Sequence, residues 1–331
     1  MQYRKFGNTG LTVSRLTLGT MTFGLQTEED VSHQILDKAT DAGVNFIDTA
    51  DVYPLGSTIE QTGRTEEIVG RWLKGRRDRF IVATKAYNKV GRSPWDQGSS
   101  RKHLLDAIDH SLRRLGTDYV DLYQLHNDDF NTPLDEMLEA LDTIVRAGKA
   151  RYIGVSNFLA YRLARALGRS DVLRTTRFVS VQPRYNLLFR QIERELLPLA
   201  GEEKLAVIPY NPLAGGLLTG KYRHDAKPTE GRFTGSVGKA GVTYTDRYWH
   251  EREFATVEKL RGIIEGAGQP LIETSIAWVL ANPVITSVLI GASRPDQLDA
   301  SLAAADFVLA PELKAELDEA TGEYRMGDAA R

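Results

Sequence analysis

The chain has 331 residues, and its 42 Lys and Arg nearly balance its 44 Asp and Glu, leaving a formal net charge of −2. This balance predicts no general electrostatic attraction to nucleic acid or to an anionic membrane, so small molecules are the expected partners. The first residues lack the apolar core of a signal peptide, and no apolar run reaches the roughly 20 residues that cross a bilayer, so we expect a cytoplasmic protein. Cysteine is absent, which excludes disulfides, thiol nucleophiles and thiolate metal sites.

A turn signal stands near the start of the chain. Gly7, Asn8 and Gly10 lie between two short extended stretches, a pattern that predicts a β-hairpin. Beyond it, short apolar runs that end abruptly alternate with amphipathic helical patterns, such as that of residues 104–115. The apolar runs cover residues 16–18, 45–47, 80–84, 120–125, 152–155, 178–181, 206–208 and 287–290. Each connection is long enough for a crossover between parallel strands.

This alternation predicts an α/β fold. Eight strand–helix units without a change of composition that would mark a linker favour a closed (β/α)8 TIM barrel over an open doubly wound sheet, with residues 1–331 as a single domain. The hairpin is then expected to cap the N-terminal mouth of the barrel. Residues 211–248, after the seventh strand, depart from the alternation and are rich in Gly, Thr and Lys. A lid, a binding loop or a disordered segment is expected there.

Ionisable side chains stand at the ends of three consecutive predicted strands. They are Asp48, Lys85 and His126, and Tyr53 lies one short loop beyond Asp48. Because the C-terminal ends of barrel strands converge on one face, these side chains are expected to share one rim. A structural ion pair and a buried histidine would explain each residue alone. Three such groups and a phenol on one rim would each lose hydration unless paired or used, which favours a functional site.

Motifs in chain order along the sequence point to a known family. They are FIDTADVY (46–53), ATK (83–85), LYQLH (122–126), GVSNF (154–158), VQPRYN (181–186), YNPLAGGLLTGKY (210–222) and LIGASRPDQL (289–298). Together they resemble the aldo-keto reductases, in particular bacterial members that also resemble potassium-channel β subunits. The resemblance implies a (β/α)8 barrel that binds NADP(H) without a Rossmann fold. The absence of a G-x-G-x-x-G fingerprint is consistent with that implication.

The resemblance assigns Asp48, Tyr53, Lys85 and His126 to the catalytic tetrad of that family, and their chemistry suits carbonyl reduction. Hydride addition to a carbonyl carbon leaves an alkoxide, so a proton must reach the oxygen as charge develops. Tyr53 is the expected proton donor, with a pKa that the Lys85 cation brings down from about 10 toward neutral pH. Asp48 is expected to balance Lys85, and His126 to hydrogen-bond the carbonyl oxygen.

Polar residues at the later strand ends are expected to hold the nicotinamide. Ser156, Asn157 and Gln182 suit its carboxamide, and the ring of Tyr210 can stack on its face. A helix N-cap is the alternative for Ser156 and Asn157, and core packing is the alternative for Gln182 and Tyr210.

The other expected cofactor contacts follow the first strand and the last two strands, or belong to the tetrad. They are Gly19, Thr20, Met21, Asp48, Asn211, Pro212, Leu213, Gly215, Leu217, Lys221, Arg232, Gly291, Ser293, Arg294 and Gln297. Ser293 and Arg294 offer a hydroxyl and a guanidinium fork that suit the 2′-phosphate of NADPH, which predicts NADPH over NADH. For Arg232 the alternative is a solvated surface charge. Whether Ser301, which stands where many relatives have Asn, contacts adenine stays open.

Two further patterns do not predict a separate function. Residues 215–221, GGLLTGK, match the first part of a phosphate-binding P-loop, but Tyr222 stands where a Ser or Thr would ligate magnesium. An NTPase is therefore not expected. The histidines other than His126 show no metal-ligand spacing, so no metal site is predicted.

These features predict NADPH-dependent reduction of an aldehyde or ketone, small or sugar-derived, to the alcohol. Large side chains near the barrel mouth are candidate pocket walls or simple packing residues: Met21, Phe23, Tyr87, Trp95, Asn127 and Phe158. The competing prediction is a regulatory module that binds NADPH and docks to a partner, as channel β subunits do. The physiological substrate, the direction of the reaction and the oligomeric state stay open.

Overall fold

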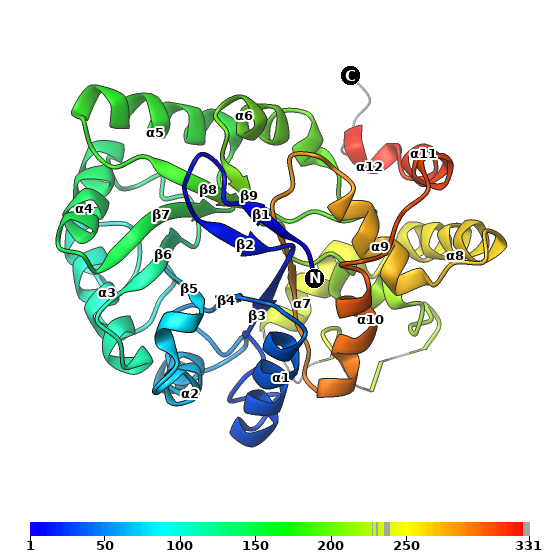
Figure 1. The fold of residues 1–331 in the computed structure, drawn as a ribbon, viewed down its shortest axis with the longest axis horizontal. Helices are drawn as coiled ribbons and strands as arrows, with labels where there is room; N and C mark the ends of the chain where they lie inside the picture. The colour runs from blue at the N-terminus through cyan, green and yellow to red at the C-terminus, as the bar shows by residue number, and fades with distance from the viewer. Residues whose placement is uncertain (227, 230, 235–238, 327–331) are drawn as a thin grey trace.

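The computed structural model describes residues 1–226, 228–229, 231–234 and 239–326. Within them, eight parallel strands form one sheet in the order β10-β3-β4-β5-β6-β7-β8-β9 (Figure 1). The eight strands are β3 (Leu16–Gly19), β4 (Phe46–Asp48), β5 (Ile81–Ala86), β6 (Val120–Leu125), β7 (Ala150–Ser156), β8 (Phe178–Gln182), β9 (Ala206–Val207) and β10 (Val288–Ile290). A separate antiparallel hairpin consists of β1 (Tyr3–Lys5) and β2 (Thr12–Ser14). The eight predicted barrel strands are therefore present in the predicted chain order.

The sheet closes on itself between β9 and β10. The backbone N–H of Thr286 donates to the carbonyl of Val207 at 2.9 Å, and that of Leu289 donates to the carbonyl of Pro209 at 2.9 Å. A parallel bridge also joins Val207 to Ile285. These contacts connect the two outermost strands, so the fold is the predicted (β/α)8 barrel.

Helices surround the sheet (Figure 1). They include α1 (Glu29–Asp41), α2 (Arg64–Leu73), α3 (Arg101–Leu115), α4 (Leu134–Arg146), α5 (Ala160–Leu173), α6 (Leu196–Glu202), α8 (Glu251–Gly266), α9 (Leu271–Leu280), α10 (Leu298–Ala303), α11 (Pro311–Ala320) and α12 (Glu323–Met326). In α3, Ser100 caps the N-terminus by accepting a hydrogen bond from the His103 N–H at 3.3 Å, and Gly116 ends the helix at φ 63°. A buried apolar stripe from Leu104 to Leu115 packs toward the barrel.

The N-terminal hairpin of β1 and β2 closes one mouth of the barrel, as predicted. Phe6 and Val13 are fully buried and share an apolar cluster with strand residues such as Phe46. The Phe6 and Phe46 rings pack edge to face with centroids 5.7 Å apart. At Gly7, φ is 57° and a Cβ would lie 2.6 Å from the backbone nitrogen of Ala206. This close approach requires glycine.

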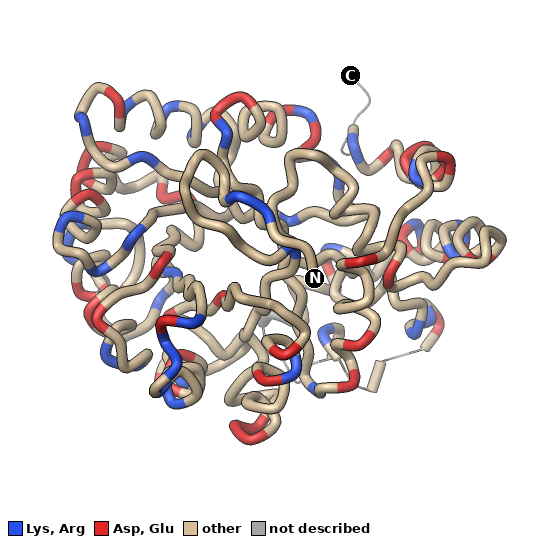
Figure 2. Tube along the Cα trace, viewed as in Figure 1, with Lys and Arg blue, Asp and Glu red and all other residues tan. Residues whose placement is uncertain are grey.

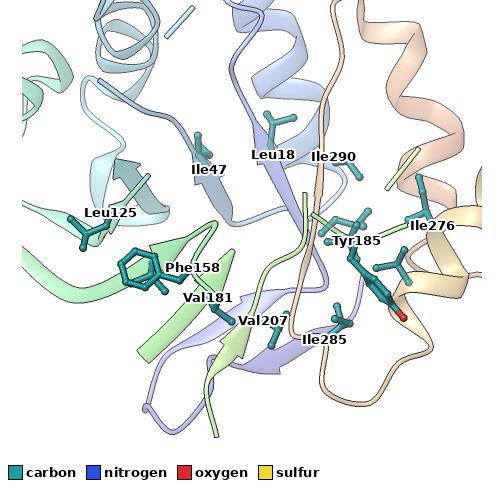
Figure 3. Close-up of a cluster of buried hydrophobic side chains, with 14 of the residues drawn as sticks. Leu18, Ile47, Leu125, Phe158, Val181, Tyr185, Val207, Ile276, Ile285 and Ile290 are labelled. Atoms are coloured by element: carbon teal, nitrogen blue, oxygen red, sulfur yellow. The ribbon is translucent and has the colours of Figure 1, made fainter. Parts of the chain in front are cut away.

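A larger apolar core lies between the strands and the helices. Figure 3 shows Leu18, Ile47 and Val181 of the strands in the same cluster as Ile276 of α9. On the outside, Lys and Arg are interspersed with Asp and Glu over the helices (Figure 2). No helix within the described residues is both long enough and apolar enough to cross a membrane.

The segment of residues 211–248 is not one continuous loop. It contains the short 3-10 helix η4 (Ala214–Thr219) and the ten-residue helix α7 (Lys239–Tyr248). Tyr244 and Tyr248 of α7 are buried, so this helix packs on the body of the protein. The expectation of a lid or binding loop missed α7, because the Gly- and Thr-rich composition of the segment conceals its helical stretch. Residues 227, 230 and 235–238 lie outside the described residues.

Candidate active site

The C-terminal ends of β4 and β5 place a buried ion pair at the mouth opposite the hairpin. Lys85 is fully buried, and its Nζ donates to Asp48 Oδ1 and, at 2.9 Å, to the carbonyl of Thr49. The other Asp48 oxygen accepts from Nε2 of Gln124 at 3.0 Å and from Nε2 of Gln182 at 2.9 Å. Side chains from β4, β5, β6 and β8 therefore meet at one carboxylate. Such a pair tolerates burial because hydrogen bonds satisfy both partners.

Tyr53 and His126 stand beside this ion pair. Tyr53 is only 8% exposed, and its ring centroid lies 5.7 Å from that of His126 and 5.2 Å from Nζ of Lys85. The structure thus brings together the four residues expected in the tetrad. Burial, and next the negative charge of Asp48, raise the pKa of Tyr53 well above its ordinary value.

The raised pKa of Tyr53 differs from the expectation that Lys85 lowers it. Burial of the phenol and the negative charge of nearby Asp48 both disfavour the phenolate, and together they raise the pKa. For His126, burial and then the Lys85 cation hold the pKa well below its ordinary value. The imidazole is therefore neutral, and the phenol retains its proton at neutral pH.

Further amide side chains surround the tetrad, and the sequence predicted no role for some of them. Nδ2 of Asn88 lies 2.9 Å from Nδ1 of His126, and Oδ1 of Asn88 accepts from Nδ2 of Asn127 at 3.3 Å. The main-chain carbonyl of His126 accepts from Nδ2 of Asn157 at 2.9 Å. Asn88 and Gln124 were missed, although both are polar residues within three positions of a predicted tetrad member. That proximity is the signal that would have identified them.

The residues expected at the nicotinamide lie together at the ends of β7, β8 and β9. Asn157 has φ 58°, donates to Ser156 Oγ at 3.2 Å and accepts from the Tyr210 hydroxyl at 2.8 Å. Ser156 donates to the carbonyl of Gln182 at 2.8 Å. The N-cap of α5 is Leu159, so Ser156 and Asn157 do not cap that helix. The amide nitrogen of Gln182 already serves the carboxylate of the ion pair.

The residues predicted at the end of β3 mainly contact the neighbouring strands β4 and β10. The backbone N–H and the hydroxyl of Thr20 donate to the carbonyl of Asp48 at 3.1 and 3.0 Å. A Cβ at Gly19 would lie 2.6 Å from a β10 side chain, so the strands approach closely there. Sδ of Met21 lies 3.6 Å from Nη1 of Arg232, which links this strand end to the segment after β9.

Hydrogen bonds of Asn211 and packing of aromatic residues hold the segment after β9 in place. Asn211 has φ 63°, accepts from the Gly215 N–H at 2.5 Å and donates to the Tyr248 hydroxyl at 3.0 Å. Gly215 has φ 72°, and a Cβ there would lie 2.8 Å from the Tyr244 ring. Nη1 of Arg232 lies 3.4 Å from the Tyr244 hydroxyl. The Arg232 guanidinium is therefore directed toward the barrel mouth instead of extending into solvent.

Other predicted contacts in this segment differ in exposure. Pro212 and Leu217 are buried, and Leu217 belongs to the main core. Leu213 is partly exposed, and Lys221 is exposed with its Nζ 4.9 Å from the Tyr222 ring centroid. Pro212 and Leu217 therefore pack inside the protein, and only Leu213 and Lys221 are accessible to a ligand.

The residues expected at the adenosine end follow β10. Gly291 is exposed directly after the strand. Oε1 of Gln297 accepts from the backbone N–H and from Oγ of Ser293 at 2.9 and 3.2 Å. The Arg294 side chain is 54% exposed, with Nε 3.4 Å from a neighbouring carboxylate. Ser301 is buried in α10, so its side chain is not an open adenine contact.

The candidate pocket walls separate into core residues and rim residues. Phe23 and Phe158 are buried, and Figure 3 shows Phe158 within the apolar core. For these two the packing alternative is correct. Trp95 is 54% exposed on the segment after β5, and Tyr87 and Asn127 are partly buried at the same end of the barrel.

Comparison with known proteins identifies the family. The model of the Aldo/keto reductase family matches residues 15–321. YrpG of Bacillus subtilis, an uncharacterized oxidoreductase, is 38% identical over 95% of this chain and 94% of its own length. A probable voltage-gated potassium channel subunit beta of Arabidopsis thaliana is 36% identical over 93% and 92%. The L-glyceraldehyde 3-phosphate reductase of Escherichia coli (strain K12) is 34% identical over 100% and 96%. The chain therefore belongs to the aldo/keto reductases, a family of oxidoreductases that generally use NAD(P)H.

Proposed function

We propose that this protein is an NADPH-dependent oxidoreductase that reduces an aldehyde or ketone, small or sugar-derived, to the alcohol. One observation carries the proposal. A neutral phenol and a neutral imidazole, those of Tyr53 and His126, stand side by side over the buried Lys85–Asp48 pair. The E. coli relative named as a reductase of L-glyceraldehyde 3-phosphate supports an aldehyde substrate.

The tetrad suits proton delivery to a carbonyl oxygen. When bound, the nicotinamide supplies the hydride to the carbonyl carbon. The hydroxyl of Tyr53 donates its proton to the oxygen as negative charge develops there, and His126 hydrogen-bonds the same oxygen and orients it. Lys85, 5.2 Å from the Tyr53 ring centroid, stabilises the phenolate that remains. Asp48 holds the Lys85 ammonium in place through the buried ion pair.

The residues around the tetrad fit a dinucleotide. Asn157 and Tyr210 offer an amide and a ring face for the nicotinamide, and Arg232 lies near the same mouth for a phosphate. Gly215 lets the Tyr244 ring of α7 pack closely against this segment, because its Cα carries no side chain. Arg294, beyond β10, is the proposed contact for the 2′-phosphate. Among the described residues, no group of His, Asp and Glu is arranged to hold a metal ion.

Substitution of Tyr53 by Phe tests the catalytic proposal. Tyr53→Phe should lower carbonyl reduction by more than about tenfold, equivalent to roughly 1.4 kcal/mol of barrier, while NADPH affinity stays close to that of the wild type. Tyr152→Phe, on a partly exposed β7 position outside the site, is the matched control. NADPH oxidation with a panel of aldehydes and ketones is the assay. Reduction that survives within tenfold would show that Tyr53 is not the acid.

Substitution of Arg294 tests the cofactor preference. Arg294→Ala should weaken NADPH binding by about 1.5 to 3 kcal/mol, the usual contribution of a charge-assisted hydrogen bond, and NADH binding far less. Arg146→Ala, which removes an exposed arginine of α4, is the control. Fluorescence titration of both cofactors decides the outcome. Equal losses for the two cofactors would contradict a role in reading the 2′-phosphate.

A second candidate function is supported by the relative from Arabidopsis thaliana. That protein is named as a probable channel β subunit and is 36% identical over nearly the whole chain. A regulatory module would keep the barrel and the cofactor and act by docking to a partner. The same carbonyl panel separates the two functions: turnover of any substrate favours the enzyme, and tight NADPH binding without turnover favours the module.

A further inference from the structure

The backbone at Tyr87 is in an unfavourable conformation next to the tetrad. Tyr87 has φ 148°, a value that side-chain-bearing residues rarely adopt. Such positions are unfavourable and persist only where surrounding contacts impose them. Here the Tyr87 carbonyl accepts from the Gly98 N–H at 2.7 Å. The turn directs the next residue, Asn88, back across the rim to His126.

The hydrogen bonds of Asn88 define which imidazole nitrogen carries the proton. Its Oδ1 accepts from Asn127, so its Nδ2 faces Nδ1 of His126 at 2.9 Å and donates to it. A nitrogen that accepts a hydrogen bond carries no proton. The neutral ring then has its proton on Nε2. Lys85 and Tyr53 are the ionisable groups beside the ring, and the Lys85 cation opposes a second proton.

We propose that Asn88 is a positioning residue that holds His126 as the Nε2–H tautomer, so that this proton is available to the carbonyl oxygen. The opposite tautomer would present a lone pair to the substrate oxygen, and that contact is repulsive. The role in catalysis rests on the proposed carbonyl reduction, whereas the assignment of the tautomer does not.

Nitrogen-15 NMR of the histidine side chains tests the tautomer directly. The His126→Gln variant identifies the His126 signals by their disappearance. The wild type should show a protonated Nε2 and an unprotonated Nδ1 at neutral pH. A proton on Nδ1, or a ring that exchanges between both forms, would overturn the proposal. This measurement needs no substrate, so it stands even if no carbonyl is reduced.

Replacement of Asn88 by Asp puts a hydrogen-bond acceptor where the amide donor stands. A carboxylate accepts from Nδ1–H, so Asn88→Asp should move the proton to Nδ1 or protonate the ring, and lower kcat by about tenfold or more. Asn8→Asp, in the N-terminal hairpin at the other end of the barrel, makes the same chemical change as a control. An unchanged His126 spectrum and an unchanged kcat in Asn88→Asp would refute the positioning role.

A separate observation concerns two partly buried arginines at the same mouth. Arg184 follows β8, and its guanidinium lies 3.5 Å from the Phe189 ring centroid. Arg184 also lies 5.7 Å from the ring centroid of Tyr248, the residue next to Arg247 in α7. Burial raises the pKa of Tyr210, and the nearby cations of Arg247 and Arg184 oppose that rise. Within the described part of the chain neither guanidinium has a carboxylate partner. Partial burial of a cation without a counter-charge is unfavourable unless an anion binds there.

Hydrogen bonds connect Tyr210, which lies beside this arginine pair, to the tetrad. The Tyr210 hydroxyl donates to Asn157, and Asn157 donates to the carbonyl of His126. The pair therefore lies on the His126 side of the mouth. Arg232, the proposed phosphate contact for the cofactor, is instead near the end of β3.

We infer that Arg184 and Arg247 bind an anionic group of the substrate, a phosphate or a carboxylate. This inference rests on the proposed carbonyl reduction. Guanidinium groups suit both anions because their planar N–H donors match pairs of oxygen atoms. The reductase would then prefer phosphorylated or carboxylated aldehydes over neutral ones of similar length.

Matched substrate pairs test this inference. Glyceraldehyde 3-phosphate is compared with glyceraldehyde, and succinic semialdehyde with butanal. Arg184→Gln and Arg247→Gln should lower kcat/KM for the anionic member by about tenfold, while neutral substrates and NADPH affinity change little. Equal losses for charged and neutral substrates, or a matching loss of NADPH affinity, would overturn the inference.

A binding measurement keeps the two proposals distinguishable. Inorganic phosphate is titrated calorimetrically into the NADPH-saturated wild type and into Arg247→Gln. Binding that the substitution weakens supports the anion site even if no carbonyl is reduced, in which case only the proposed reductase function fails. Absence of phosphate binding, together with equal turnover of charged and neutral aldehydes, would refute the anion site.

Discussion

Two acidic residues three positions apart, Asp48 and Asp51, are buried in contrasting ways. Both oxygens of Asp48 have partners, namely Lys85 on one and two glutamine amides on the other. Neither oxygen of Asp51 accepts a hydrogen bond from the described residues, although Asp51 is only 1% exposed. The charge at the proposed catalytic position is therefore paired, whereas the neighbouring carboxyl group has no such compensation.

The surroundings of Asp51 explain its state. Burial first, and then the negative charge of Glu66, raise the pKa of Asp51 well above its usual range. Glu66 itself accepts from Oγ1 of Thr84 at 2.5 Å and from Nε of Arg114 at 2.7 Å. The available donors thus serve Glu66, and Asp51 is held as a neutral acid. Both carboxyl groups are buried, so burial alone does not decide which one keeps its charge. The number of hydrogen-bond donors around each carboxyl group makes the difference.

The largest expected effect is the loss of the ion pair at Asp48. Lys85→Met should abolish most carbonyl reduction and lower the free energy of unfolding by about 3 to 5 kcal/mol, because it leaves a buried carboxylate without its counter-charge. Urea unfolding and NADPH oxidation measure the two effects. Lys38→Met, which removes a surface ion pair with Asp299, should cost less than about 1 kcal/mol.

The coupling between Lys85 and Tyr53 sharpens this prediction. Groups that act as one unit are strongly non-additive, so Lys85→Met combined with Tyr53→Phe should lose little more activity than either substitution alone. Losses that multiply would show that the ammonium and the phenol act independently.

An intermediate effect is expected where Asp48 keeps its counter-charge and loses one donor. Gln124→Leu leaves only the Gln182 amide on that oxygen. We expect a loss of about 1.5 to 3 kcal/mol in the free energy of unfolding, the usual contribution of a hydrogen bond to a charged group. Gln191→Leu, at an exposed position, is the matched control. If Gln124→Leu unfolds at the same urea concentration as the wild type, the donor count around Asp48 does not matter for stability.

The smallest effect should have the opposite sign. Because the folded-state pKa of Asp51 is raised, the folded protein binds a proton that the unfolded chain releases above its pKa of about 3.9, so wild-type stability falls as pH rises through that window. Asp51→Asn removes this loss. The variant should match the wild type in stability below about pH 4 and exceed it at neutral pH. An advantage that does not grow with pH would contradict a neutral Asp51.

The sequence alone determined the barrel and the gathering of the tetrad. Apolar runs that end in Asp48, Lys85 and His126 are separated by crossovers of helical length, and parallel strands joined in that way bring their C-terminal ends to one rim. The N-terminal hairpin could also be predicted from the sequence. The positive φ of 57° at Gly7 belongs to the local turn, so the hairpin could be predicted from nearby residues.

Only the tertiary structure decided how the polar groups around the tetrad are shared. Gln182 was expected to face a carboxamide, yet its amide nitrogen donates to Asp48, 134 positions away in the chain. Asn88 reaches His126 through an unusual backbone turn at Tyr87, which no local pattern announces. The pKa of Tyr53 rises because the phenol is buried and lies near the negative charge of Asp48. Each outcome depends on which donors and charges meet in space, and residues far apart in the sequence compete for them only after the barrel has closed.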